Sequence, residues 1–177
     1  MDLVTAATQI VKEFPQARFL LLGEDRGTMP YIQQEIARLG LQDFFAIIPG
    51  RPDPENIYAA IDVYVCTSDT EGFSNVILEA MACGKAVIAT NVGGNPEAVV
   101  PDKTGIIVPV RSPKAISQAA RRLLESPELR LSMGALGRKR IEEQFSVKMM
   151  VTAHEKLYSR LLLDRSISAA AKDKVTQ

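Results

Sequence analysis

The chain has 177 residues, which is about one domain and enough for a sizeable core. Apolar residues make up 46% and charged residues 24%, as expected for a globular protein, and the formal net charge is zero. Zero net charge argues against a general nucleic-acid binder, which would be basic. The longest apolar runs are too short to cross a bilayer, and no signal sequence opens the chain, so we expect a cytoplasmic protein.

In chain order, the apolar patterns predict helices and strands that alternate up to residue 110. The predicted helices cover residues 3–14, 29–39, 54–60, 74–83 and 95–100, the last with Asn95 as N-cap. The predicted strands cover residues 18–22, 44–48, 61–66, 86–90 and 105–108. Because these strands are continuously apolar and alternate with helices, we predict an α/β fold with a Rossmann-like parallel sheet and helices on both faces.

After residue 110 the pattern becomes purely helical, which predicts a helical C-terminal extension. The expected helices cover residues 112–125, 127–144 and 147–163. The last residues, 166–177, are small and polar, and we expect them to fray. The chain is therefore predicted to be one domain over residues 1–165 with a frayed tail.

Cysteine and histidine usage gives no sign of a metal site. Cys66 lies in a predicted buried strand and Cys83 at a helix end, where free cysteine usually packs as a small hydrophobic residue. His154 is the only histidine, and a lone histidine cannot build a zinc site.

The most informative segment begins with Glu71 and continues to Glu79. A strand leads into a glycine-containing loop and then a helix start, which is where α/β proteins bind phosphate. Backbone N–H groups at a helix start have no intrahelical partner, and a glycine lets a phosphate approach closely. The donors expected here belong to Gly72, Phe73, Ser74 and Asn75. A second glycine turn, Gly93-Gly94, follows the next strand.

The chain resembles the retaining, nucleotide-sugar-dependent glycosyltransferases of the GT-B fold, known as glycosyl transferases group 1 and family 4-like. The resemblance rests on EGFSNVILEAMACGKAVIATNVGGNPEAV followed by TGIIVPV. The hallmark of this family is a pair of glutamates separated by seven residues. The resemblance covers roughly residues 20–162 and implies a C-terminal donor-binding domain, the second half of a hexosyltransferase.

The resemblance also implies roles for individual residues. It places Glu79 on the donor ribose hydroxyls and makes Glu71 the catalytic residue beside the transferred sugar, in a mechanism usually described as front-face. Gly93 and Gly94 would border the sugar pocket. The loop against the nucleobase would consist of Gly50, Arg51 and Pro52. The expected substrate is a nucleotide-diphosphate sugar, with no other cofactor and no metal, since no Asp-x-Asp follows a strand end.

One family feature is missing from the sequence. A strand should precede the first helix and carry a Gly-Arg pair and a Lys that hold the donor diphosphate, but the chain opens inside that helix. In the family order this first strand lies mid-sheet, so its absence predicts a gap about one strand wide between residues 18–22 and 61–66. The acceptor domain is missing as well. We therefore expect these residues alone to be truncated and inactive.

The expected partners are a nucleotide sugar and, through the missing half, an acceptor glycan or a lipid-linked sugar of polysaccharide biosynthesis. Basic residues on the late helices are interspersed with acidic ones and predict an ion-paired surface, with a peripheral membrane contact as the alternative. These basic residues are Arg121, Arg122, Arg138, Lys139 and Arg140.

Two other functions stay open, a non-catalytic or degenerate nucleotide-binding fragment and half of a nucleotide-sugar epimerase. A nicotinamide-binding domain is disfavoured because no G-x-G-x-x-G follows a first strand. The sequence defines neither the sugar, the base nor the acceptor.

Overall fold

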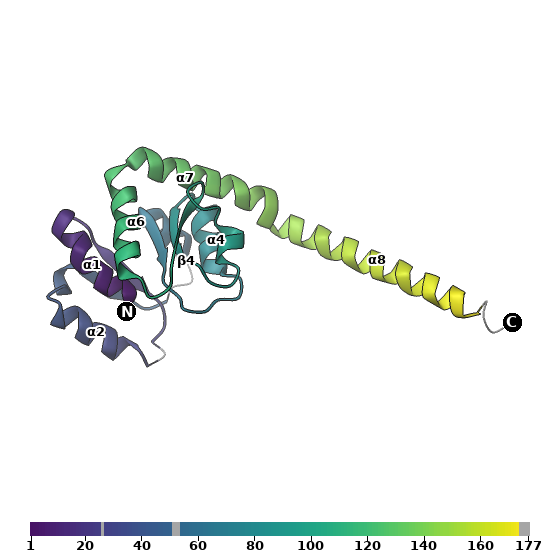
Figure 1. Ribbon diagram of the computed structural model, residues 1–177, viewed down its shortest axis with the longest axis horizontal. Helices are drawn as coiled ribbons and strands as arrows, with labels where there is room; N and C mark the ends of the chain where they lie inside the picture. Colours follow the sequence, from purple (N-terminus) through teal and green to yellow (C-terminus); the bar gives the residue numbers. More distant parts are fainter. Residues whose placement is uncertain (26, 51–53, 174–177) are drawn as a thin grey trace. The chain divides into compact units, whose positions relative to one another are not determined.

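The computed structural model describes residues 1–25, 27–50 and 54–173 (Figure 1). The chain divides into two compact units, Met1–Lys139 and Arg140–Gln177. The predicted domain of residues 1–165 contains the whole first unit and part of the second.

The first unit alternates helices and strands, as the sequence predicts. Its helices are α1 (Asp2–Glu13), α2 (Met29–Arg38), η1 (a 3-10 turn, Gln42–Phe44), α3 (Pro54–Ala60), α4 (Asn75–Ala82), α5 (Asn95–Ala98), α6 (Pro113–Glu125) and α7 (Pro127–Arg140). Its strands are β1 (Phe19–Leu22), β2 (Phe45–Ile48), β3 (Val63–Cys66), β4 (Ala86–Thr90) and β5 (Gly105–Val108). Three strands are shorter than predicted, because Arg18 precedes β1, Phe44 belongs to η1, and Ile61 precedes β3.

The strands form two separate parallel sheets. β1 pairs with β2, with Phe19 opposite Phe45, and the second sheet has the order β3-β4-β5. Within the described residues, β1 and β3 are not hydrogen-bonded to each other. The predicted break between these two strands is therefore confirmed, and they do not close up into one sheet.

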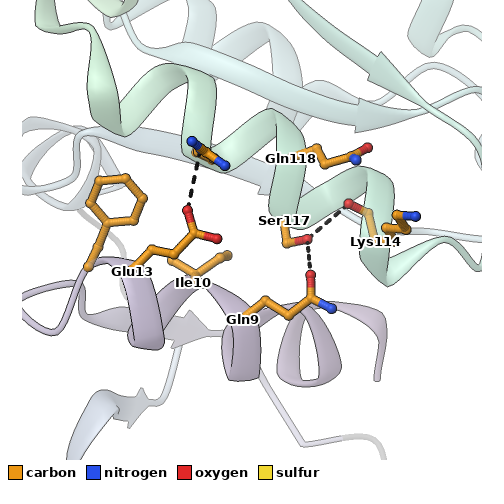
Figure 2. A pocket seen from close by; sticks show the side chains of 8 residues that line it. Gln9, Ile10, Glu13, Lys114, Ser117 and Gln118 are labelled. Carbon is orange, nitrogen blue, oxygen red and sulfur yellow. Dashed lines mark hydrogen bonds and ion pairs between the residues drawn. The ribbon is translucent and has the colours of Figure 1, made fainter.

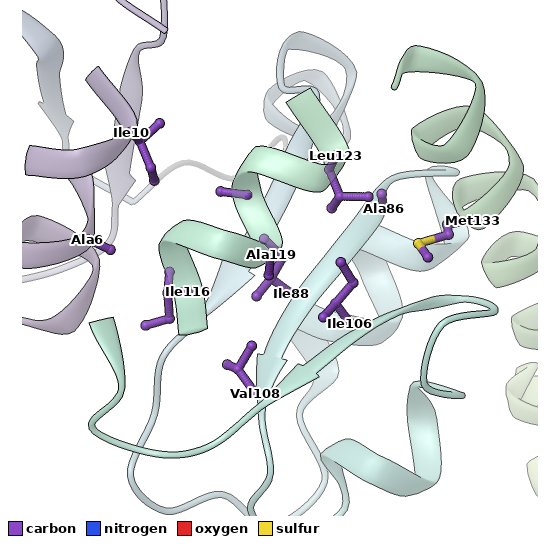
Figure 3. Close-up of a cluster of buried hydrophobic side chains, with 11 residues drawn as sticks. Ala6, Ile10, Ala86, Ile88, Ile106, Val108, Ile116, Ala119, Leu123 and Met133 are labelled. Carbon is purple, nitrogen blue, oxygen red and sulfur yellow. The ribbon is translucent and has the colours of Figure 1, made fainter. Parts of the chain in front are cut away.

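Helices cover both sides of the three-stranded sheet, with α6 on one side of β4 and α4 on the other (Figure 1). Every residue of β4 is buried. Ala86 and Ile88 pack with Ile116 and Leu123 of α6 in the main hydrophobic cluster (Figure 3). Since side chains alternate along a strand, Val87 points to the opposite face, toward α4. The α/β fold with helices on both faces is thus confirmed.

Helix α1 takes part in two hydrophobic clusters. Ala6 and Ile10 belong to the cluster that contains α6 and the three-stranded sheet (Figure 3). Val4 and Ala7 pack in a second cluster with α2, β1 and β2. This helix therefore joins the hydrophobic cores of both sheets.

The N-cap predicted for α5 is wrong. Gly94 is the N-cap and Asn95 is the first helical residue. The physical reason is that the Asn95 side chain is fully buried and its Nδ2 donates to the carbonyl of Thr90 at 3.1 Å. The side chain therefore bonds to the end of β4 and does not cap the helix.

The second unit is helical. The predicted helix of residues 127–144 ends as an α-helix at Arg140 and continues as a π-helical turn, η2 (Ile141–Phe145), with the Arg140 guanidinium 5.3 Å from the Phe145 ring centre. Helix α8 (Val147–Asp173) then includes residues 166–173, which were predicted to fray. No Gly or Pro interrupts α8, and its alanines favour helix, which explains the longer helix.

We predict that residues 1–177 alone are marginally stable or associate. Within the described residues, β1 and β3 each keep one edge without a ladder partner. A buried unpaired backbone group costs about 1–3 kcal/mol, against a domain stability of about 5–15 kcal/mol. Thermal unfolding together with sedimentation tests this expectation. A monomer that unfolds cooperatively at high temperature would contradict it.

Candidate functional site

The loop after β3 and the loop after β4 are packed backbone to backbone. The Gly94 N–H donates to the carbonyl of Gly72 at 2.6 Å. A Cβ on Gly93, whose φ is +49°, would lie 2.0 Å from the Glu71 carbonyl oxygen, and one on Gly94 would lie 2.4 Å from the Phe73 ring. Only glycine allows this approach, so the structure brings together the two loops that the sequence singles out.

The start of α4 presents backbone donors beside open space. Ser74 is its N-cap, but the Ser74 side chain makes no capping hydrogen bond. Leu78 N–H donates to the Ser74 carbonyl at 3.3 Å and so closes the first turn of the helix. No atom lies within 4 Å of a Cβ placed on Gly72. The helix dipole and these donors favour an anion at this position.

Glu71 is held by a chain of hydrogen bonds. The Ser68 hydroxyl donates to Glu71 Oε1 at 2.7 Å. The Thr90 hydroxyl donates to the Ser68 carbonyl at 2.7 Å, and Asn95 donates to the Thr90 carbonyl. The catalytic carboxylate predicted from the sequence is therefore oriented by residues from the ends of β3 and β4.

Glu79 is held from a different element. The Tyr58 hydroxyl of α3 lies 3.0 Å from Glu79 Oε2 and 3.3 Å from the Val76 carbonyl oxygen. Burial, followed by the hydrogen bond to Glu79, raises the pKa of Tyr58 above its ordinary value. The phenol is therefore protonated at neutral pH and acts as the donor. Glu79 itself is exposed and accessible to a ligand.

Both glutamates act electrostatically on Tyr64 of β3. Burial raises the pKa of Tyr64 most, followed by Cys66, Glu71 and Glu79. Tyr64 also packs edge-on against Tyr58, with ring centres 6.0 Å apart. The two carboxylates therefore act on the same partly buried phenol.

One further predicted binding residue, Gly50, follows the two-stranded sheet. Gly50 is exposed after β2. Arg51 and Pro52 lie outside the described residues. The structure thus gathers the residues that follow β3 and β4, from Glu71 to Asn75 with Gly93 and Gly94.

Sequence reasoning missed Tyr58 and Ser68. Ser68 lies three residues before Glu71, a spacing that could have indicated a local hydrogen bond. Tyr58 lies 21 residues before Glu79 on another helix, and no local pattern indicates that contact.

A recess of about 170 Å³ lies elsewhere, between α1 and α6 (Figure 2). Ser117 donates to Gln9 at 2.9 Å across it, and Arg121 pairs with Glu13 at 3.3 Å. Its volume is below the roughly 300–1,000 Å³ of small-molecule sites, so we interpret it as part of a helix–helix interface.

The basic residues of α6 are ion-paired, as the sequence predicts. Arg121 also pairs with Glu125 at 2.8 Å, and Arg122 pairs with Asp102 at 2.9 Å. In the part of the chain that the structure describes, no helix is long and apolar enough to cross a membrane.

Glycine loops, a helix start without a side-chain cap and two oriented carboxylates lie together near the carboxyl ends of parallel strands, the edge at which open α/β sheets bind ligands. Residues 1–140 match the family described as "Glycosyl transferases group 1". The chain belongs to that family, which confirms the family that the sequence predicts.

Relatives and solved structures agree with this assignment. The chain is 33% identical over 163 residues to N-acetyl-alpha-D-glucosaminyl L-malate synthase of Bacillus anthracis, covering 92% of this chain and 42% of that protein. It resembles Anabaena HepE in complex with UDP, with 27% identity, a TM-score of 0.82 and coverage of 89% and 44%. It also resembles the C-terminal domain of the group 1 protein LpcC from Francisella tularensis, with 29% identity, a TM-score of 0.74 and coverage of 82% and 78%. The chain thus spans about two fifths of the length of the curated relative and of HepE.

We predict that Gly93→Ala destabilises the protein by more than about 2 kcal/mol, because alanine is strained at this φ and its Cβ meets the Glu71 carbonyl. The matched control is Gly72→Ala in the facing loop, where a Cβ meets no atom and the cost should stay under about 1 kcal/mol. Urea unfolding measures both. Equal stability of the two variants would contradict the close packing.

Proposed function

We propose that the chain is the donor-binding half of a retaining glycosyltransferase that binds a nucleotide-diphosphate sugar at the carboxyl ends of β3 and β4. The observation that carries this proposal is the backbone contact of Gly93-Gly94 with Glu71-Gly72, beside the uncapped start of α4. Support also comes from HepE, a structural relative that is described in complex with UDP-glucose.

The diphosphate would lie at the start of α4. Backbone N–H groups of Gly72, Phe73, Ser74 and Asn75 precede or open this helix, and the open space at Gly72 admits a phosphate oxygen. Metal-free binding is part of the proposal, with the backbone donors and the positive end of the helix dipole, rather than a metal ion, facing the phosphates.

Glu79 would accept hydrogen bonds from the ribose hydroxyls. A carboxylate has two oxygens and can accept from both hydroxyls of a vicinal diol. The Tyr58 hydroxyl uses one of the two acceptor positions of Oε2, so the other position of Oε2 and those of Oε1 are left for the two hydroxyls of the ligand.

Glu71 would face the transferred sugar and stabilise positive charge that develops at its anomeric carbon. The Ser68 hydroxyl holds Oε1, which fixes the carboxylate before the substrate arrives.

Acceptor binding, whether of a glycan or a lipid-linked sugar, would belong to the rest of the enzyme. We place this enzyme in the cytoplasm, with a peripheral membrane contact.

The first test concerns Glu79. We expect Glu79→Ala to weaken nucleoside diphosphate binding by about one to two orders of magnitude, since hydrogen bonds to a charged group contribute about 1.5–3 kcal/mol. Calorimetric titration with UDP, GDP and ADP measures the change. The control is Glu35→Ala, because Glu35 pairs with Arg38 on its own helix α2. Unchanged affinity in folded Glu79→Ala removes Glu79 from the ribose site.

The second test concerns Glu71 in an active protein that contains this chain. We expect Glu71→Gln to lower kcat much more than nucleoside diphosphate affinity, because its contacts are with the sugar and the developing charge. Turnover assays and titration on one preparation separate the two effects. Turnover near the unmodified level would show that Glu71 only complements the helix dipole.

A further inference from the structure

The hydrogen bond between Tyr58 and Glu79 joins a buried donor to an exposed carboxylate. Tyr58 is only 7% exposed, whereas Glu79 is exposed. Helical glutamate side chains in water sample several rotamers, and ordering a long side chain costs free energy when a ligand binds. Here one carboxylate oxygen is already held at 3.0 Å by a buried donor.

The donor is itself fixed in place. Its ring packs edge-on against Tyr64, and its helix α3 is attached to the loop after α4 by Lys85, whose Nζ donates to the Ala59 carbonyl at 3.3 Å. These contacts restrain the Tyr58 hydroxyl, so rotation of the Glu79 carboxylate would lengthen the hydrogen bond between them. It selects one orientation of Glu79, with Oε2 turned toward α3.

We propose that Tyr58 is a positioning residue that orients Glu79 for a ribose diol and so sets the preference for ribonucleotides over 2′-deoxyribonucleotides. This inference rests on the proposed function. Tyr58 contributes through Glu79 and makes no ligand contact of its own. Pre-orientation favours a ligand that offers two neighbouring hydroxyls, because both must meet the carboxylate at once.

The test uses Tyr58→Phe, which removes one oxygen and keeps the ring packing. UDP, GDP and ADP are titrated into the full chain by calorimetry, each beside its 2′-deoxy analogue. We expect the affinity for the preferred ribonucleotide to fall about tenfold, which corresponds to about 1.4 kcal/mol, and that for its deoxy analogue to fall about twofold. The ratio of the two affinities should therefore fall about fivefold. The control Tyr158→Phe, which removes a hydroxyl from exposed α8, should leave this ratio unchanged.

A double-mutant cycle with Glu79→Gln separates positioning from a general loss of stability. If Tyr58 acts through Glu79, Tyr58→Phe should change the ratio little once Glu79 is altered. Additive effects, or an unchanged ratio in Tyr58→Phe while the unmodified chain binds nucleotide, would overturn the inference alone. No nucleotide binding by the unmodified chain would overturn the proposed function and this inference with it.

Discussion

Packing of α1 against α6 is the contact on which the first unit depends. In most parallel sheets the hydrogen-bonded ladder runs through every strand, but here β1 and β3 are not paired within the described residues. Ala6 and Ile10 of α1 instead share a cluster with α6 and β4, while the other face of α1 packs with β1 and β2. The two sheets are thus held together by apolar packing between helices, where most parallel sheets have backbone hydrogen bonds between neighbouring strands.

The two sheets contribute differently to the candidate site. The loops that carry Glu71 and Gly93 both belong to the three-stranded sheet, whose central strand is wholly buried. Gly50 follows β2 in the other sheet, whose strands are partly exposed. A local opening of the two-stranded sheet would disturb the predicted base-binding loop before it reached the two carboxylates, since less buried elements open at lower free energy.

Much of the fold could be predicted from the sequence because its signals are local. Continuous apolar strands, Pro at helix starts and the two glycine turns all act over a few residues, and the elements that they indicate are present. The break between β1 and β3 was predictable from the resemblance. The length of α8 was not, because small polar residues at a chain end favour fraying, whereas this segment contains no helix breaker and is helical to Asp173.

The parts of the site that could not be predicted depend on contacts between distant residues. The sequence indicates Asn95 as an N-cap, but the fold buries its side chain, where Nδ2 donates to the Thr90 carbonyl. In the sequence, Tyr58 has the pattern of an apolar residue in a short helix. Its contact with Glu79 exists only because α3 packs beside α4 in the folded chain.

The two glutamates are held in different ways. Ser68, which holds Glu71, is a near neighbour in the same loop, whereas the donor to Glu79 comes from another helix. Holding Glu71 requires that the loop after β3 is formed and is supported by Thr90 at the end of β4, within a single sheet. Holding Glu79 requires that α3 is docked against α4. The orientation of Glu79 therefore depends on tertiary packing outside the loop. Substitutions that loosen α3 should weaken the proposed ribose contact, whereas the hydrogen bond that holds Glu71 should persist.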